Sequence, residues 1–412
     1  MKKQFILFGI LTLGLALLAQ EITHETLVIN IEIPVRVFKG SNFIDNLTID
    51  DFDVYEDGKL QRLEAVYLIK KKNIERKEEK RKFSPDISRT FYLFFEIVGY
   101  TPRLRDALDY FVQNVLAPGD TLFIVTPIKT YEMHSEALEL KSKAEIVEEL
   151  NGLLRKDAMI GSMDYRSSIN ELTRLTRAFS ASLVSEDDES RRLIQDFPSE
   201  YHGMDPTTLL ETLVTNYRKV LEKLESLKYI DQSKLLDFAE SLKNKDGKTY
   251  VFLFYEREFI PKIEPTFLAR IVSLFQSDQH IVQGLADIFQ SYTRQITFDI
   301  DRIKQAYADA STSIHFMFFT KPAEHIPEIR FEEHSENIYA AFREISKATG
   351  GITESSASPD FLFKQVADAS ENYYLLYYTP SNYKKDGQFK NIKVKVKNAD
   401  YRVIHRAGYF AK

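Results

Sequence analysis

Five short segments of almost continuous apolar sequence constrain the fold more than any other feature of the chain. Strands that are covered on both faces have this composition, because neither face meets water. Helical patterns separate several of the segments, as in the stretch from Leu104 to Val115. The segments are Thr90–Val98, Thr121–Thr126, Tyr250–Tyr255, Ile314–Phe319 and Tyr373–Tyr378. Their alternation with helices predicts an α/β fold, with a three-layer, doubly wound and mostly parallel sheet in residues 89–379.

The middle of the chain contains more helix than such a sheet requires. We predict a helical insertion over residues 155–247, in which Asp205-Pro206 begins a helix with Asp at the N-cap and Pro in the first turn. A second helical stretch covers residues 267–310. We expect these helices to pair and to form a lobe on the α/β domain.

Both ends of the chain show the alternation of apolar and polar side chains that is typical of half-buried strands. In residues 22–75, Asp57-Gly58 predicts a tight hairpin turn. Residues 380–412 predict a further hairpin, and residues 76–88 predict a charged linker. Either end alone would be a small unsupported sheet, so we expect the C-terminal hairpin to pack on the N-terminal β module.

The N-terminus is typical of a secretory signal, which we place at residues 1–19. Lys2 and Lys3 precede an uncharged apolar run, Phe5–Ala19, that is short for a membrane span. An uncleaved N-terminal anchor is the alternative. We expect an exported protein, periplasmic or extracellular, with no membrane span after the signal is cleaved.

The composition excludes several kinds of chemistry. The chain has no cysteine, which excludes disulfides, thiolate catalysis and zinc–sulfur sites. The net charge is −6 with acids and bases interspersed, so we expect no nucleic-acid partner. A P-loop, a GxGxxG motif and a GxSxG motif are all missing from the sequence. We expect no cofactor and no enzymatic activity.

Four separated segments resemble the bacterial exported VWFA-related proteins, relatives of the von Willebrand factor type A domain. Asn42–Gln61 (NFIDNLTIDDFDVYEDGKLQ) is similar to the family pattern F-V-x-x-L-T-x-x-D-F-x-V-Y-E-D-G. The others are Ala348–Gly351 (ATGG), Tyr373–Pro380 (YYLLYYTP) and the tail Gly387–Ala411, which contains RAGYF at residues 406–410. The segments span nearly the whole mature chain in order, whereas the middle diverges. The resemblance implies an A-type α/β binding domain.

The resemblance also implies a metal position at the ends of the central strands. In A-type domains, an Asp-x-Ser-x-Ser loop and a distant Thr and Asp supply the hard oxygen ligands that Mg²⁺ or Ca²⁺ prefers. The loop positions here are Glu96, Val98 and Tyr100, and the distant acid falls at Glu256 and Arg257. One aligned acid without a serine pair predicts a degenerate site that holds no metal. We expect Glu96 and Arg257 to form a salt bridge instead.

The function that we expect is non-catalytic binding to an unknown protein partner, or adhesion, in the bacterial envelope and without a metal. A metal-dependent adhesin that uses Glu96 and Glu256 is one alternative, and it predicts measurable binding of Mg²⁺ or Ca²⁺. A hydrolase with a carboxylate pair at the strand ends is another, and it predicts two acids close together in a pocket. The sequence leaves the oligomeric state open.

Overall fold

The computed structural model describes residues 29–181, 199–201, 204–243, 245, 247–292, 296–320 and 330–412. The predicted signal, residues 1–19, lies outside this range. One sheet has the strand order β14-β12-β10-β7-β8-β9, in which neighbours are parallel except for the antiparallel pair β8 and β9. Its strands are β7 (Arg89–Glu96), β8 (Thr121–Val125), β9 (Thr130–Met133), β10 (Lys248–Glu256), β12 (Ser313–Phe319) and β14 (Thr353–Ser356).

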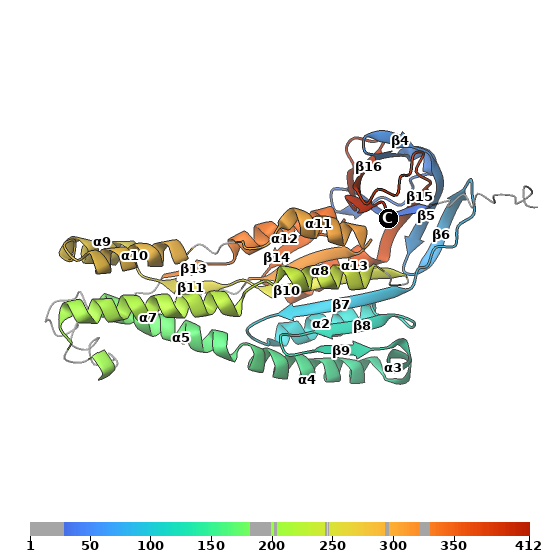
Figure 1. The fold of residues 1–412 in the computed structure, drawn as a ribbon. Helices are drawn as coiled ribbons and strands as arrows, with labels where there is room; N and C mark the ends of the chain where they lie inside the picture. Colours follow the sequence, from blue (N-terminus) through green and yellow to red (C-terminus); the bar gives the residue numbers. More distant parts are fainter. Residues whose placement is uncertain are drawn as a thin grey trace, which may run out of the picture.

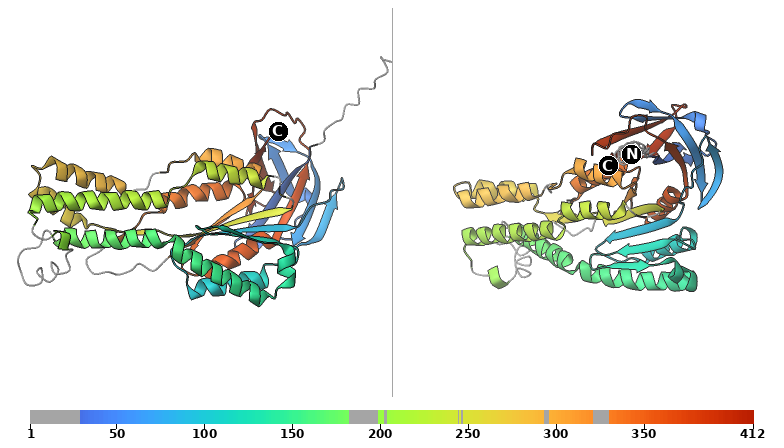
Figure 2. Two further views of the ribbon diagram at one scale, coloured as in Figure 1. Left: turned by 60° about the horizontal axis from the view of Figure 1, so that its bottom comes forward. Right: turned by 45° about the vertical axis from the view of Figure 1, so that its right-hand side comes forward.

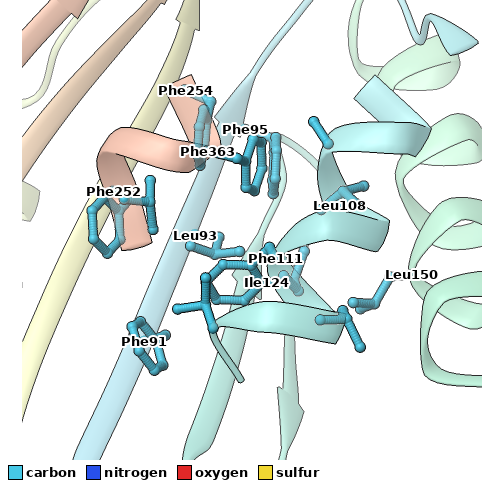
Figure 3. Packing of buried hydrophobic residues seen from close by; sticks show 14 of the residues in the cluster. Phe91, Leu93, Phe95, Leu108, Phe111, Ile124, Leu150, Phe252, Phe254 and Phe363 are labelled. Atoms are coloured by element: carbon cyan, nitrogen blue, oxygen red, sulfur yellow. The ribbon is translucent and has the colours of Figure 1, made fainter. Parts of the chain in front are cut away.

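Helices cover both faces of this sheet. One face packs against α2 (Pro102–Asn114), α4 (Lys143–Gly161) and α13 (Pro359–Glu371), with the short α3 (Ser135–Leu140) nearby (Figure 1). The other face packs against α8 (Gln232–Leu242), α11 (Ile300–Asp309) and α12 (Glu336–Ala348). Figure 3 shows how aromatic rings fill the first core, where Phe254 stacks on Phe363 with 4.5 Å between ring centroids. The continuous apolar strands therefore bury side chains on both faces, as their sequence requires.

The predicted fold class is nevertheless wrong. The chain is α/β, but this partly parallel sheet is one of several, and the other sheets are antiparallel. The apolar segment Tyr373–Tyr378, expected in the parallel sheet, forms β15 (Asn372–Tyr378) between β1 (Ile31–Lys39) and β5 (Leu63–Lys70) in an antiparallel sheet. The side chains on its two faces belong to two different hydrophobic clusters. A continuous apolar run therefore indicates that a strand is buried on both faces, but it does not indicate whether the strand is parallel or antiparallel to its neighbours.

The antiparallel part is built from both ends of the chain and is larger than a small module. The sheet β17-β1-β15-β5-β6 also carries β2, and a second sheet has the order β18-β16-β3-β4. Together they curl around one core as a half-barrel (Figure 2). The remaining bounds are β2 (Asn42–Phe43), η1 (Ile49–Asp51), β3 (Phe52–Glu56), β4 (Lys59–Gln61), β6 (Asn73–Glu79), β16 (Phe389–Val396), β17 (Arg402–His405) and β18 (Gly408–Phe410). We call this part the β module. Strand β6 reaches into the segment expected as a charged linker.

A helical arm projects from the sheet at the end far from the β module (Figure 1). Its elements are α5 (Met163–Ala181), η2 (Ser199–Tyr201), α7 (Pro206–Leu227), β11 (Phe259–Lys262), α9 (Pro265–Leu274), α10 (Gln279–Ser291) and β13 (Arg330–Glu333). All of these elements except β13 contribute residues to a hydrophobic core of their own. Inside it, the hydroxyl of Tyr217 donates to the carbonyl of Pro261 at 2.8 Å. No helix among the described residues combines the length and the apolar character that a bilayer span needs.

Two of the sequence segments that carry the family resemblance meet where the β module joins the helices. The N–H of Ala407 donates to the carbonyl of Ala348 at 2.7 Å, and Thr349 forms an isolated bridge with Arg406. The buried guanidinium of Arg406 donates to the carbonyls of Glu32, at 2.8 Å, and Ala308, at 3.4 Å. These segments therefore act as structural connectors between the two parts of the molecule.

Candidate functional site

The carboxylates of Glu96 and Glu256 leave the sheet on opposite faces. Glu96 ends β7 and lies opposite Tyr255 in the parallel register, so the side chains of Glu96 and Tyr255 share one face. Glu256, the next residue along β10, then points to the other face. The register therefore prevents the two acids from converging on one ion.

Glu96 is held by a lysine from the helical arm. Its carboxylate accepts a hydrogen bond from the ammonium of Lys228, the residue that follows α7. The same ammonium lies 5.1 Å from the ring centroid of Tyr165 and 5.7 Å from that of Tyr255. A cation between two aromatic faces and a carboxylate is well satisfied, so this cluster fixes the arm to the sheet.

Glu256 fastens the loop that follows β7. One of its carboxylate oxygens accepts from the backbone N–H of Val98 at 2.6 Å and from that of Gly99 at 3.3 Å. The carbonyl of Val98 accepts from the hydroxyl of Ser162 at 2.8 Å. The loop at which the sequence resemblance implied metal ligands is therefore held by hydrogen bonds within the protein.

Tyr100 and Arg257 also have partners within the protein. The hydroxyl of Tyr100 donates to the side chain of Asn151, and burial raises the pKa of Tyr100 to about 12. The guanidinium of Arg257 donates to Glu333 at 2.8 Å and lies 5.0 Å from the ring centroid of Tyr339. The expected salt bridge between Glu96 and Arg257 is therefore wrong, because each residue pairs with a different element.

We predict that Mg²⁺ and Ca²⁺ leave the stability of the chain unchanged. The strand-end acids already have donors, and no group of three or more His, Asp or Glu residues gathers for a metal in the described part. A site with a Kd of about 1 mM would add about 1.4 kcal/mol at about 10 mM metal. Thermal unfolding with and without the ion measures this, and a calorimetric titration that releases or absorbs heat would contradict it.

An exposed apolar patch lies beside the closed loop. It consists of Ile128, Met159, Ile160 and Met163, whose side chains are 45–62% exposed. Ile128 lies in the loop between β8 and β9. A Cβ built on Gly161 would lie 3.6 Å from the Cδ1 atom of Ile128, so this loop contacts the junction between α4 and α5. Large exposed apolar patches mark interaction surfaces, and methionine adapts its shape to a partner. We call these four residues the apolar patch.

Our sequence predictions did not include the apolar patch, although the sequence holds a signal for it. The buried stripe of α4 follows helical spacing. Its apolar members are Ile146, Val147, Leu150, Leu154 and Ala158. Met159 and Ile160 fall off this stripe, and Met163 follows at the start of α5. Lys228 was missed for another reason, since only the folded arm brings it to Glu96.

The comparisons with known proteins give little more. No protein-family model matches the sequence, and no curated protein matches it. Among solved structures, the chain is similar to the human COPII-coat protein Sec24c, with 8% sequence identity and a TM-score of 0.27. The match covers 80% of this chain and 44% of that chain, so this chain spans less than half of that protein. A similarity at this TM-score supports no argument about function.

Proposed function

We propose that the chain is an exported, non-catalytic protein that binds another protein in the bacterial envelope, without a metal. The observation that supports this most is the apolar patch, which adjoins strand ends whose acids are all engaged internally. The secretory-type N-terminus and the resemblance to exported VWFA-related proteins support the location and remain part of the proposal.

The apolar patch suits a protein partner on energetic grounds. Burying a large apolar side chain contributes about 1.5–3 kcal/mol. Four such side chains at the centre of an interface provide the kind of cluster that dominates binding energy between proteins. Neither alternative function has comparable support, because a metal-dependent adhesin and a hydrolase both need acids that converge, and Glu96 and Glu256 diverge.

Charges placed in the apolar patch are expected to abolish partner binding. In a crosslinking pulldown from native envelopes, the double variant Met159→Glu/Met163→Glu should lose, by at least about tenfold, the partner that the unmodified chain recovers. Both side chains are exposed, so the fold should persist. Leu140→Glu is the matched control, since Leu140 is 86% exposed and lies outside the patch. Equal recovery with the double variant and the control would refute the proposal.

A further inference from the structure

A groove lies between the β module and the helices of the α/β part. Its volume is about 1220 Å³, and its walls come from α11 and α12 on one side and from β16 and β17 on the other. The start of β14 also lines it. Pockets for small molecules are typically about 300–1,000 Å³, so this groove is large for such a ligand.

The outer edge of β14 is free in the part of the chain that the structure describes. In the sheet order β14 is terminal and pairs only with β12. The carbonyls of Ile352 and Ser356 accept from the N–H groups of Phe316 and Thr320, at 2.9 and 3.0 Å. Because alternate residues of a parallel strand bond to the same neighbour, Thr353 and Ser355 turn their backbone N–H and C=O groups outward. This edge can therefore accept another strand.

Two buried hydroxyls in the groove wall have no hydrogen-bond partner. They are Oγ of Ser346, a residue that is 1% exposed, and Oγ1 of Thr353. A buried polar atom without a partner costs about 1–3 kcal/mol, and each such atom requires an explanation. Both oxygens are shielded from solvent in the unbound chain, so a polar ligand in the groove would reach them only after the side chains rotate.

Charges of both signs line the groove. Arg343 and Lys347 on α12 have no ion pair with a described residue, and Arg402 on β17 lies on the opposite wall. Burial raises the pKa of Glu354 on β14, and the positive charge of Arg402 acts on that carboxyl in the opposite direction. The groove can therefore form ion pairs with a polypeptide that carries both acidic and basic side chains.

We propose that this groove binds an extended polypeptide segment, which adds to β14 as a further strand. Its backbone bonds to Thr353, which lines the groove, and to Ser355, two residues further along β14, and its side chains reach the charged groups on α12 and β17. Strand addition of this kind uses main-chain hydrogen bonds for affinity and side-chain contacts for selectivity. The inference rests on the proposed function, protein binding, and adds a contact separate from the apolar patch.

Ser355→Pro tests the proposal, with Ser355→Ala as its matched control. Proline removes the outward N–H of residue 355, and proline is tolerated on an edge strand where that N–H bonds to no neighbour. Both variants lose the side-chain contact between Ser355 and Thr320, so they differ in the backbone alone. The probe is a set of 12-residue peptides selected from a random displayed library on the purified full chain. We expect the Kd of these peptides, measured by fluorescence anisotropy, to rise at least tenfold in Ser355→Pro and to change less than twofold in Ser355→Ala.

Hydrogen exchange provides the second measurement and separates this proposal from the first one. In the unmodified chain, the bound peptide should slow exchange at the N–H groups of Thr353 and Ser355. The Met159→Glu/Met163→Glu variant should bind the same peptides unchanged, even where it loses the envelope partner. The groove proposal would be overturned if the selected peptides bound Ser355→Pro as tightly as the unmodified chain, or if their binding required the apolar patch. Failure to select any binding peptide would also overturn it. The apolar-patch proposal would be unaffected by any of these results.

Discussion

Gly351→Ala is expected to be among the most damaging single substitutions in the chain, at about 4 kcal/mol or more of folding free energy. A Cβ at this position would lie 1.7 Å from the carbonyl oxygen of Ile314 and 2.6 Å from its carbon. Both are backbone atoms at the start of β12, so no side chain can move aside. The new methyl group must push the end of α12 away from the sheet, which breaks contacts on both sides of this junction.

Gly152→Ala is the matched control, and its effect should have the opposite sign. Gly152 lies within α4, and a Cβ there would meet no atom within 4 Å. Alanine in a helix interior is favoured over glycine by about 0.5–1 kcal/mol. Thermal unfolding followed by circular dichroism measures both changes. If the two variants unfold at the same temperature, the close approach of Gly351 to Ile314 does not exist.

Phe363→Ala is expected to lower the free energy of unfolding by about 3–5 kcal/mol. The substitution leaves a cavity in the core between the sheet and the helices α2, α4 and α13. Phe363 is fully buried and stacks on Phe254 with centroids 4.5 Å apart, and it meets the ring of Phe111 at 6.0 Å (Figure 3). Alanine removes these contacts, and a rigid sheet of aromatic side chains cannot close the cavity.

Phe361→Ala controls for the loss of an aromatic residue from the same helix. Phe361 lies two positions earlier in α13 but is 43% exposed. Its substitution should change the free energy of unfolding by less than about 1 kcal/mol. Chemical denaturation measures the free energy of unfolding of each variant, and the two values are compared. Similar losses in both would mean that α13 does not present Phe363 to the sheet.

Local features of the fold could be predicted from the sequence, since their causes are local. Asp57 and Gly58 both adopt positive φ, and Glu56 pairs with Lys59, which confirms the hairpin turn. Asp205 caps α7 by accepting from two backbone N–H groups, which confirms that helix start. Strand partners are a different matter, because hydrophobic periodicity does not encode them. For this reason β15 was assigned to the wrong sheet.

The candidate site was predictable only in its position along the chain. The sequence indicates that Glu96 lies near the end of one strand and that Glu256 directly follows another, but the side of the sheet that each occupies depends on the register between β7 and β10. The partner of Glu96 is Lys228 and the partner of Arg257 is Glu333, and both partners belong to the helical arm. Such long-range pairs depend on how the arm packs against the sheet, and a pattern of neighbouring residues in the sequence does not predict this packing.

The central place of β15 has a consequence for how the molecule is made. A ribosome produces β1 and β5 first, yet the strand that joins them, with Ile31 opposite Tyr378, lies far along the chain at Asn372–Tyr378. Until residue 378 is available, both early strands keep an open edge that invites wrong pairing. Slow formation of these distant contacts is expected of such a topology. A nascent chain of this protein therefore exposes the facing edges of β1 and β5 until β15 has been synthesised.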